Sequence, residues 1–162
     1  MVIKTLSFGQ RSLLFAKLSK IAYYNIKQAK KQAEKLGFTE VEFYNKKCAQ
    51  AYRFMNKSDV VIACRGTEPT QFNDISADLK AMPVVAETVS RVHSGFKAEV
   101  DELWPNIMAD LMSKQPKQRL WFCGHSLGAA MATIMASRCH YLCSNSPRIK
   151  RRMCYGQCVQ CN

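Results

Sequence analysis

The sequence predicts an α/β protein with a mostly parallel sheet and flanking helices. Short apolar runs at 59–64 and 120–123 have the length and composition of strands buried on both faces. Segments with helical spacing of apolar residues separate these runs. A glycine-flanked turn, Gly124 to Gly128, leads from the second run into an uncharged, Ala-rich segment at 129–136. With 162 residues, no repeats and no linker, the chain fits one domain with a sizeable core.

The N-terminal part is predicted to form two helices between Leu6 and Leu36, with a break near Tyr24 and Asn25. Gly37 is a suitable residue to end the second helix. This second helix carries four lysines, for which a solvated face is favoured over membrane contact.

The middle of the chain alternates between predicted strands and helices. Residues 39–44 and 51–55 indicate a hairpin, and 59–64 a buried strand. Residues 68–79 begin polar and become helical, and a longer helix is expected from Val92 to Met112. The helix after the glycine turn is expected to end after Ser137, with loop-like chain from Cys139 to Pro147.

The net charge of +12 is the unusual feature of the composition. The last acidic residue is Asp110, so an acid-free C-terminal third supplies much of the excess. No nucleic-acid motif and no basic stripe interleaved with aromatics is present, and a nucleic-acid partner is not expected. Lysines and arginines interrupt residues 1–24, so no signal peptide is predicted, and no apolar run is long enough for a transmembrane helix. The eight cysteines are therefore expected to be reduced, in a cytoplasmic protein.

Strand, G-x-S-x-G and helix together form the context of a nucleophile elbow. In this sequence the motif is Gly124-His125-Ser126-Leu127-Gly128. Glycines flank the serine because the turn is too tight for neighbouring side chains, and the helix N-terminus behind the serine favours negative charge near its oxygen. The alternative is an ordinary serine in a tight turn, with glycines that serve geometry alone.

Three segments resemble the class 3 (fungal-type) triacylglycerol lipase family when they are taken in order. They are VVIACRGTEPTQFNDISADL, RVHSGFKAEV and LWFCGHSLGAAMATIMA. The resemblance runs from about Leu13 to about Gln157 and implies the α/β-hydrolase fold. It also implies hydrolysis of acylglycerol-type esters through an acyl-enzyme, with no cofactor and no metal. The implied partners are a lipid or ester substrate and, transiently, a membrane or lipid surface.

The resemblance assigns roles to particular residues. Ser126 matches the nucleophile, and Thr67 matches the oxyanion-hole Ser/Thr of the family. The backbone N–H of Leu127 is the second oxyanion donor. The segment 68–79 matches the lid helix. His125 and His93 match supporting positions, so neither is expected to be the catalytic base.

The sequence departs from the family pattern after the elbow. The triad order in this fold is Ser, then acid, then His. Here no Asp or Glu follows Ser126, and the only later histidine, His140, lies too close behind the elbow. The expectation is a partial α/β-hydrolase, residues 1–157, that lacks the C-terminal strands. A divergent cysteine-containing tail, residues 158–162, follows, and the chain is expected to be catalytically incomplete as it stands.

The tail has a second interpretation as a metal site, because Cys154, Cys158 and Cys161 are spaced like cluster ligands. No space for the corresponding barrel domain follows, so no metal is predicted. The remaining alternative to an ester hydrolase is a non-catalytic lipase remnant that binds lipid or a partner protein.

Overall fold

A computed structural model describes residues 1–47, 49–66, 83–84, 92–113, 118–146 and 149. Its main sheet has four strands in the order β1-β2-β3-β6. They are β1 (Glu40–Lys46), β2 (Ala49–Met55), β3 (Asp59–Cys64) and β6 (Arg119–Gly124). A separate two-stranded ladder joins β4 (Pro83–Val84) to β5 (Val92–His93).

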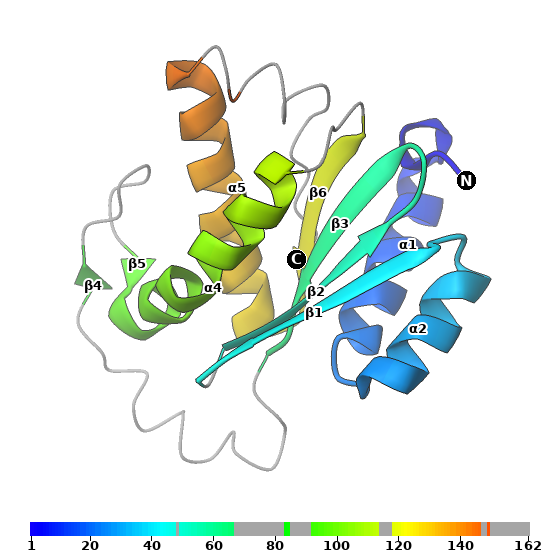
Figure 1. Ribbon diagram of the computed structural model, residues 1–162, viewed down its shortest axis with the longest axis horizontal. Coiled ribbons are helices and arrows are strands. Elements are labelled where there is room, and N and C mark those ends of the chain that lie inside the picture. Colours follow the sequence, from blue (N-terminus) through cyan, green and yellow to red (C-terminus); the bar gives the residue numbers. More distant parts are fainter. Residues whose placement is uncertain (48, 67–82, 85–91, 114–117, 147–148, 150–162) are drawn as a thin grey trace.

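Helices cover both faces of the main sheet (Figure 1). The helices α1 (Phe8–Ile21) and α2 (Ile26–Lys35) pack on one face, after a short 3₁₀ turn at Ile3–Thr5. The helices α4 (Ser94–Ser113) and α5 (Leu127–Asn145) pack on the other face. Each face therefore has its own apolar cluster, and β2, β3 and β6 are buried on both sides, whereas the edge strand β1 is largely exposed.

The N-terminal helices begin and end where local chemistry predicts. Ser7 and Gln10 form a reciprocal capping box at the start of α1, and the Asn25 side chain accepts from Gln28 N–H at the start of α2. Gly37 follows α2 with φ of 81°, a left-handed conformation that favours glycine. The two predicted helices and the break between them are confirmed.

The sheet is mixed, which differs from the mostly parallel sheet that the sequence predicts. β1 with β2 and β2 with β3 are antiparallel, and only β3 with β6 is parallel among the described strands. The predicted hairpin is confirmed, and the short 56–58 connection then turns the chain straight back into β3. Three strands linked by short turns have to alternate in direction, because a parallel pair needs a long crossover.

The β3–β6 pair is tied to the N-terminus by Asp59, which is fully buried. Its carboxylate accepts from the Ile3 N–H at 2.9 Å and from Trp121 Nε1 at 2.8 Å. Both oxygens are thus used, as a buried carboxylate requires.

The helix after the elbow is longer than predicted, because α5 continues through Asn145. The region from Cys139, expected to be a loop, is helical because Cys139 and Cys143 pack into the core. Arg138 is also buried and forms an ion pair with Asp101 of α4. In the described part of the chain, no helix combines the length and the hydropathy that a bilayer crossing needs.

Candidate active site

Ser126 lies between β6 and α5, on the strand–turn–helix that the motif predicts. Its backbone has φ of 56° and ψ of −128°, which is strained for a residue with a side chain. The Ser126 hydroxyl makes no hydrogen bond to the N-terminus of α5, and none to any other described residue. The side chain is half-buried, and because its hydroxyl forms no hydrogen bond, it is not part of the polar contacts that stabilise the fold.

The flanking glycines are required by close backbone contacts. A Cβ on Gly124 would lie 2.2 Å from the carbonyl oxygen of Gly128. A Cβ on Gly128 would lie 2.3 Å from the carbonyl oxygen of Cys64, at the end of β3. The turn therefore presses the start of α5 onto the neighbouring strand, as a nucleophile elbow does.

The start of α5 offers an electropositive environment beside Ser126. Leu127 is the first residue of this 19-residue helix, so its N–H has no acceptor within the helix. The N–H groups of Gly128 and Ala129 are already bonded to the carbonyls of His125 and Ser126. The N–H of Leu127 is thus the one that remains for an oxyanion, and the helix dipole adds to its effect.

The end of β3 lies against the elbow. Cys64 is followed by Arg65 and by Gly66, where a Cβ would lie 2.4 Å from the His125 carbonyl oxygen. The next residue is Thr67, which lies outside the described residues, as does the predicted lid segment at 68–79. The oxyanion role of Thr67 therefore stays a prediction, although the described chain leads up to the elbow.

Tyr23 also reaches this edge, which no pattern in the sequence indicates. Its Oη lies 3.2 Å from His125 Nδ1, and the guanidinium of Arg65 lies 5.6 Å from the centre of its ring. Arg65 in turn donates to the Gln50 side chain at 2.9 Å. The end of α1, the end of β3 and the elbow are joined through these contacts. The contacts span 102 residues between Tyr23 and His125, so only the folded chain reveals them.

His125 and His93 each contact an aromatic side chain. His125 is exposed and has Tyr23 as its neighbour. His93 stacks on Phe96 with ring centres 4.3 Å apart, and its Nδ1 accepts from the Gly95 N–H at 3.2 Å. Neither contact involves Ser126, so both histidines remain predicted as supporting residues.

His140 is excluded as a base by its place on α5. It follows Leu127 by 13 residues on one continuous helix, which separates them by about 20 Å along the axis. Two carboxylates of α4 form ion pairs with basic side chains: Asp101 pairs with Lys97 and Arg138, and Glu102 pairs with Lys47. Glu99 is half-buried, and burial raises the pKa of its carboxyl. The described residues thus provide Ser126 with no hydrogen-bonded base.

The expectation that all cysteines are reduced is wrong for one of them. Cys64, Cys123 and Cys139 are buried and form no disulfide, and burial raises the pKa of the Cys64 thiol. Cys143 is disulfide-bonded, where reduced thiols were expected throughout. The tail cysteines that could hold a metal lie outside the described residues.

Comparison with known proteins places this geometry in a family. The model of the family "Lipase (class 3)" matches residues 61–159, which is more than half of the chain and includes the elbow. A search of curated proteins gave no match.

Several solved lipase structures share the fold. The Rhizomucor miehei triacylglyceride lipase matches with a TM-score of 0.65 and 17% identity, over 91% of this chain and 61% of its own. A lipase from Rhizopus microsporus var. chinensis matches with a TM-score of 0.62 and 17% identity, over 92% of this chain and 57% of its own. A triacylglycerol lipase with a serine protease triad as its catalytic centre matches with a TM-score of 0.65 and 20% identity, over 81% of this chain and 55% of its own.

The chain thus spans little more than half the length of these lipases. Identities this low show a shared fold, whereas the family model also matches the sequence around the elbow. The chain, with its partial α/β-hydrolase fold, belongs to the class 3 lipase family.

Proposed function

We propose that this protein hydrolyses carboxylic esters of the acylglycerol type, with Ser126 as the nucleophile. The observation that carries the proposal is the strained Ser126 backbone at the start of a 19-residue helix, with an uncommitted hydroxyl. This conformation costs about 1–3 kcal/mol, and such strain is concentrated at functional sites. The related triacylglycerol lipase with a serine protease triad supports the same chemistry.

The proposed reaction proceeds through an acyl-enzyme. The Ser126 Oγ attacks the ester carbonyl after a base has removed its proton, and the resulting oxyanion accepts hydrogen bonds from Leu127 N–H and from Thr67. Collapse of the tetrahedral intermediate expels the alcohol, which receives the proton from the same base. Water then hydrolyses the acyl-serine by the same steps in reverse. The substrate is an ester of a lipid, so the reaction takes place in contact with a lipid surface.

The 162 residues supply no triad acid in the family's order, because no Asp or Glu follows Ser126. His140 is about 20 Å away along α5 and cannot supply the base. For these 162 residues taken alone, we expect the oxyanion donors and substrate binding to leave a residual acceleration of ~10³–10⁴ over water.

A second candidate is a lipase fold that binds lipid without turnover, because the described residues give Ser126 no hydrogen-bonded base. An esterase assay with p-nitrophenyl butyrate, run beside the Ser126→Ala variant, separates the two. Weak hydrolysis by both proteins, faster than in buffer, supports the ester hydrolase, because the residual acceleration comes from the oxyanion donors and substrate binding. Rates equal to the rate in buffer support the binding protein. Robust turnover by the 162-residue chain would contradict the incomplete triad and would require a base among the residues not described here.

A complementation experiment tests whether an added acid and histidine complete the site. Fusion of the C-terminal segment of a related lipase, which carries the acid and the histidine, is expected to restore fast turnover. This gain should vanish with Ser126→Ala in the same fusion. A fused chain that is folded but remains as slow as the original would argue against Ser126 as nucleophile.

A further inference from the structure

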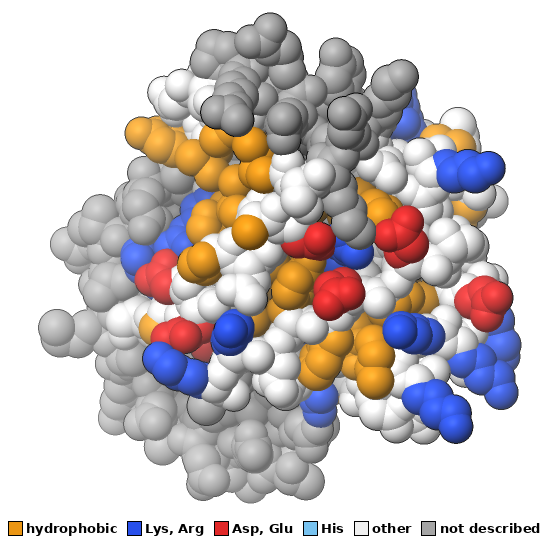
Figure 2. Space-filling model, viewed as in Figure 1, with side chains coloured by type: hydrophobic (Ala, Val, Ile, Leu, Met, Phe, Trp, Pro, Cys, Tyr) orange, Lys and Arg blue, Asp and Glu red, His pale blue; other side chains and the backbone are white. Residues whose placement is uncertain are grey.

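The N-terminal segment that forms α1 and α2 has a large net positive charge. The first 36 residues contain eight Lys and Arg but a single acidic residue, Glu34. This is a net charge of +7 out of the +12 of the whole chain. Figure 2 shows Lys and Arg side chains gathered over α2, at the lower right of the view.

The lysines of this layer are exposed and are not engaged in ion pairs. There are six of them on the two helices, and none forms a salt bridge in the part of the chain that the structure describes. They are Lys17, Lys20, Lys27, Lys30, Lys31 and Lys35. On the opposite layer, by contrast, Lys97 pairs with Asp101 and the arginine of α5 with the same carboxylate. The positive charge of α1 and α2 is therefore available to an outside partner.

The direction of this charge on α2 follows from its helical geometry. Ala29 and Ala33 are fully buried against the sheet. At 100° per residue, Lys27, Lys31 and Lys35 point away from these alanines, and Lys30 flanks them. Glu34 is the only acid on this outward face. The helix thus presents a basic surface away from the protein body.

This basic surface begins beside the candidate active site. Tyr23, just after α1, contacts His125 of the elbow, and Asn25 then caps the start of α2. Ile26, the first residue of α2, is 38% exposed, and Leu13 of α1 is 57% exposed. Apolar side chains interspersed among lysines suit the boundary between lipid headgroups and acyl chains.

We propose that α1 and α2 form a docking surface for anionic lipid, which holds the elbow edge next to the lipid–water interface. The proposal rests on the lipid substrate of the proposed function, and it adds the face and the charge that recognise the surface. Lysine is a strongly hydrated point charge, which suits a diffuse anionic surface, whereas arginine forks suit individual phosphates of nucleic acids. All six exposed cations on the two helices are lysines.

Vesicle co-sedimentation tests the proposal with the full 162-residue chain. We expect binding to phosphatidylcholine vesicles that contain phosphatidylglycerol, little binding to phosphatidylcholine alone, and loss of binding at high salt. The variant Lys27→Gln/Lys31→Gln should bind about 25-fold more weakly, because each lysine near an anionic surface contributes roughly a factor of five. The variant Glu34→Lys should bind more tightly by a similar factor.

The matched control removes two exposed lysines that lie off this layer, Lys46→Gln/Lys57→Gln. Equal losses in the two double variants, or equal binding to neutral and anionic vesicles, would overturn the proposal. Tighter binding to double-stranded DNA than to the anionic vesicles would also overturn it, because the layer would then serve a nucleic acid. Ser126→Ala should bind vesicles normally, so a failure of docking is distinguishable from a failure of catalysis.

Discussion

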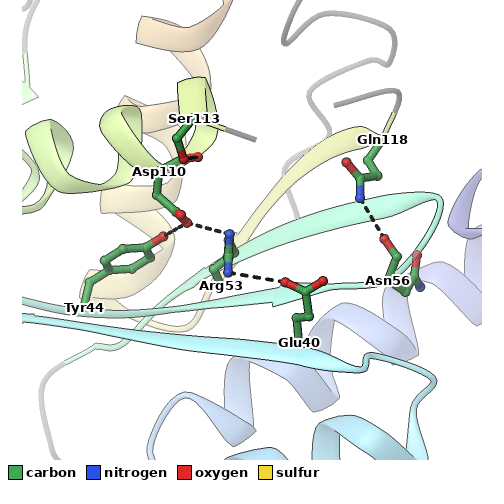
Figure 3. A network of polar contacts seen from close by, with 7 residues as sticks. All are labelled: Glu40, Tyr44, Arg53, Asn56, Asp110, Ser113 and Gln118. Atoms are coloured by element: carbon green, nitrogen blue, oxygen red, sulfur yellow. Dashed lines mark hydrogen bonds and ion pairs between the residues drawn. The ribbon is translucent and has the colours of Figure 1, made fainter. Parts of the chain in front are cut away.

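Substitution of Asp110 by alanine is expected to destabilise the fold far more than the loss of a surface ion pair. Asp110 lies on α4 and holds the guanidinium of Arg53, whose side chain is 4% exposed in the middle of the sheet (Figure 3). Arg53 Nη1 lies 2.6 Å from Asp110 Oδ2, and the hydroxyl of Tyr44 donates to the same oxygen at 2.6 Å. Burial, followed by this hydrogen bond to Asp110, raises the pKa of Tyr44, so the phenol remains a donor.

The expected magnitude follows from the burial of Arg53. Removal of one partner from a buried pair costs about 3–5 kcal/mol, since the other charge is left without compensation. The Asp110 side chain is 24% exposed, and Glu40 remains 3.9 Å from Arg53, so we expect a loss of about 2–4 kcal/mol. In a chain of this size the melting temperature should fall by roughly 5–15 °C.

Thermal unfolding followed by circular dichroism measures this effect against a control in the same network. Glu40→Gln removes a carboxylate that is 54% exposed, and it should cost less than about 1 kcal/mol. Arg53→Met combined with Asp110→Ala should be more stable than Asp110→Ala alone, because the buried charge is then absent. Equal losses from Asp110→Ala and Glu40→Gln, or simple additivity in the double variant, would refute the reasoning.

Two further predictions concern the elbow. Ser126→Gly should raise the free energy of unfolding by about 1 kcal/mol relative to Ser126→Ala, because glycine relieves the positive φ; equal stabilities in urea titration would contradict the strain. Gly128→Ala should lower stability by about 3 kcal/mol, since its Cβ would meet the Cys64 carbonyl, which is backbone and cannot move aside. Gly9→Ala is the matched control, with no atom near its Cβ, and should be neutral or stabilising by up to about 1 kcal/mol. A Gly128→Ala protein as stable as Gly9→Ala would show that the elbow tolerates a side chain.

Local patterns in the sequence determined the elements that depend on neighbouring residues. The strands at 59–64 and 119–124, the glycine turn around Ser126 and the caps of α1 and α2 all follow from short-range periodicity and turn chemistry. The family resemblance also rests on such local segments, and the family model confirms it.

The tertiary structure decided the features that depend on residues far apart in the chain. Helix α5 extends through Asn145 because Arg138 forms an ion pair with Asp101 of α4 and because Cys143 packs in the core. No local pattern in the sequence indicates these contacts. The contact between Tyr23 and His125 likewise forms only when α1 packs on the face of the sheet. The outward direction of the α2 lysines is readable from helical spacing alone. The contact that brings the chain just before α2 to the elbow is not, because it depends on how helices and strands pack.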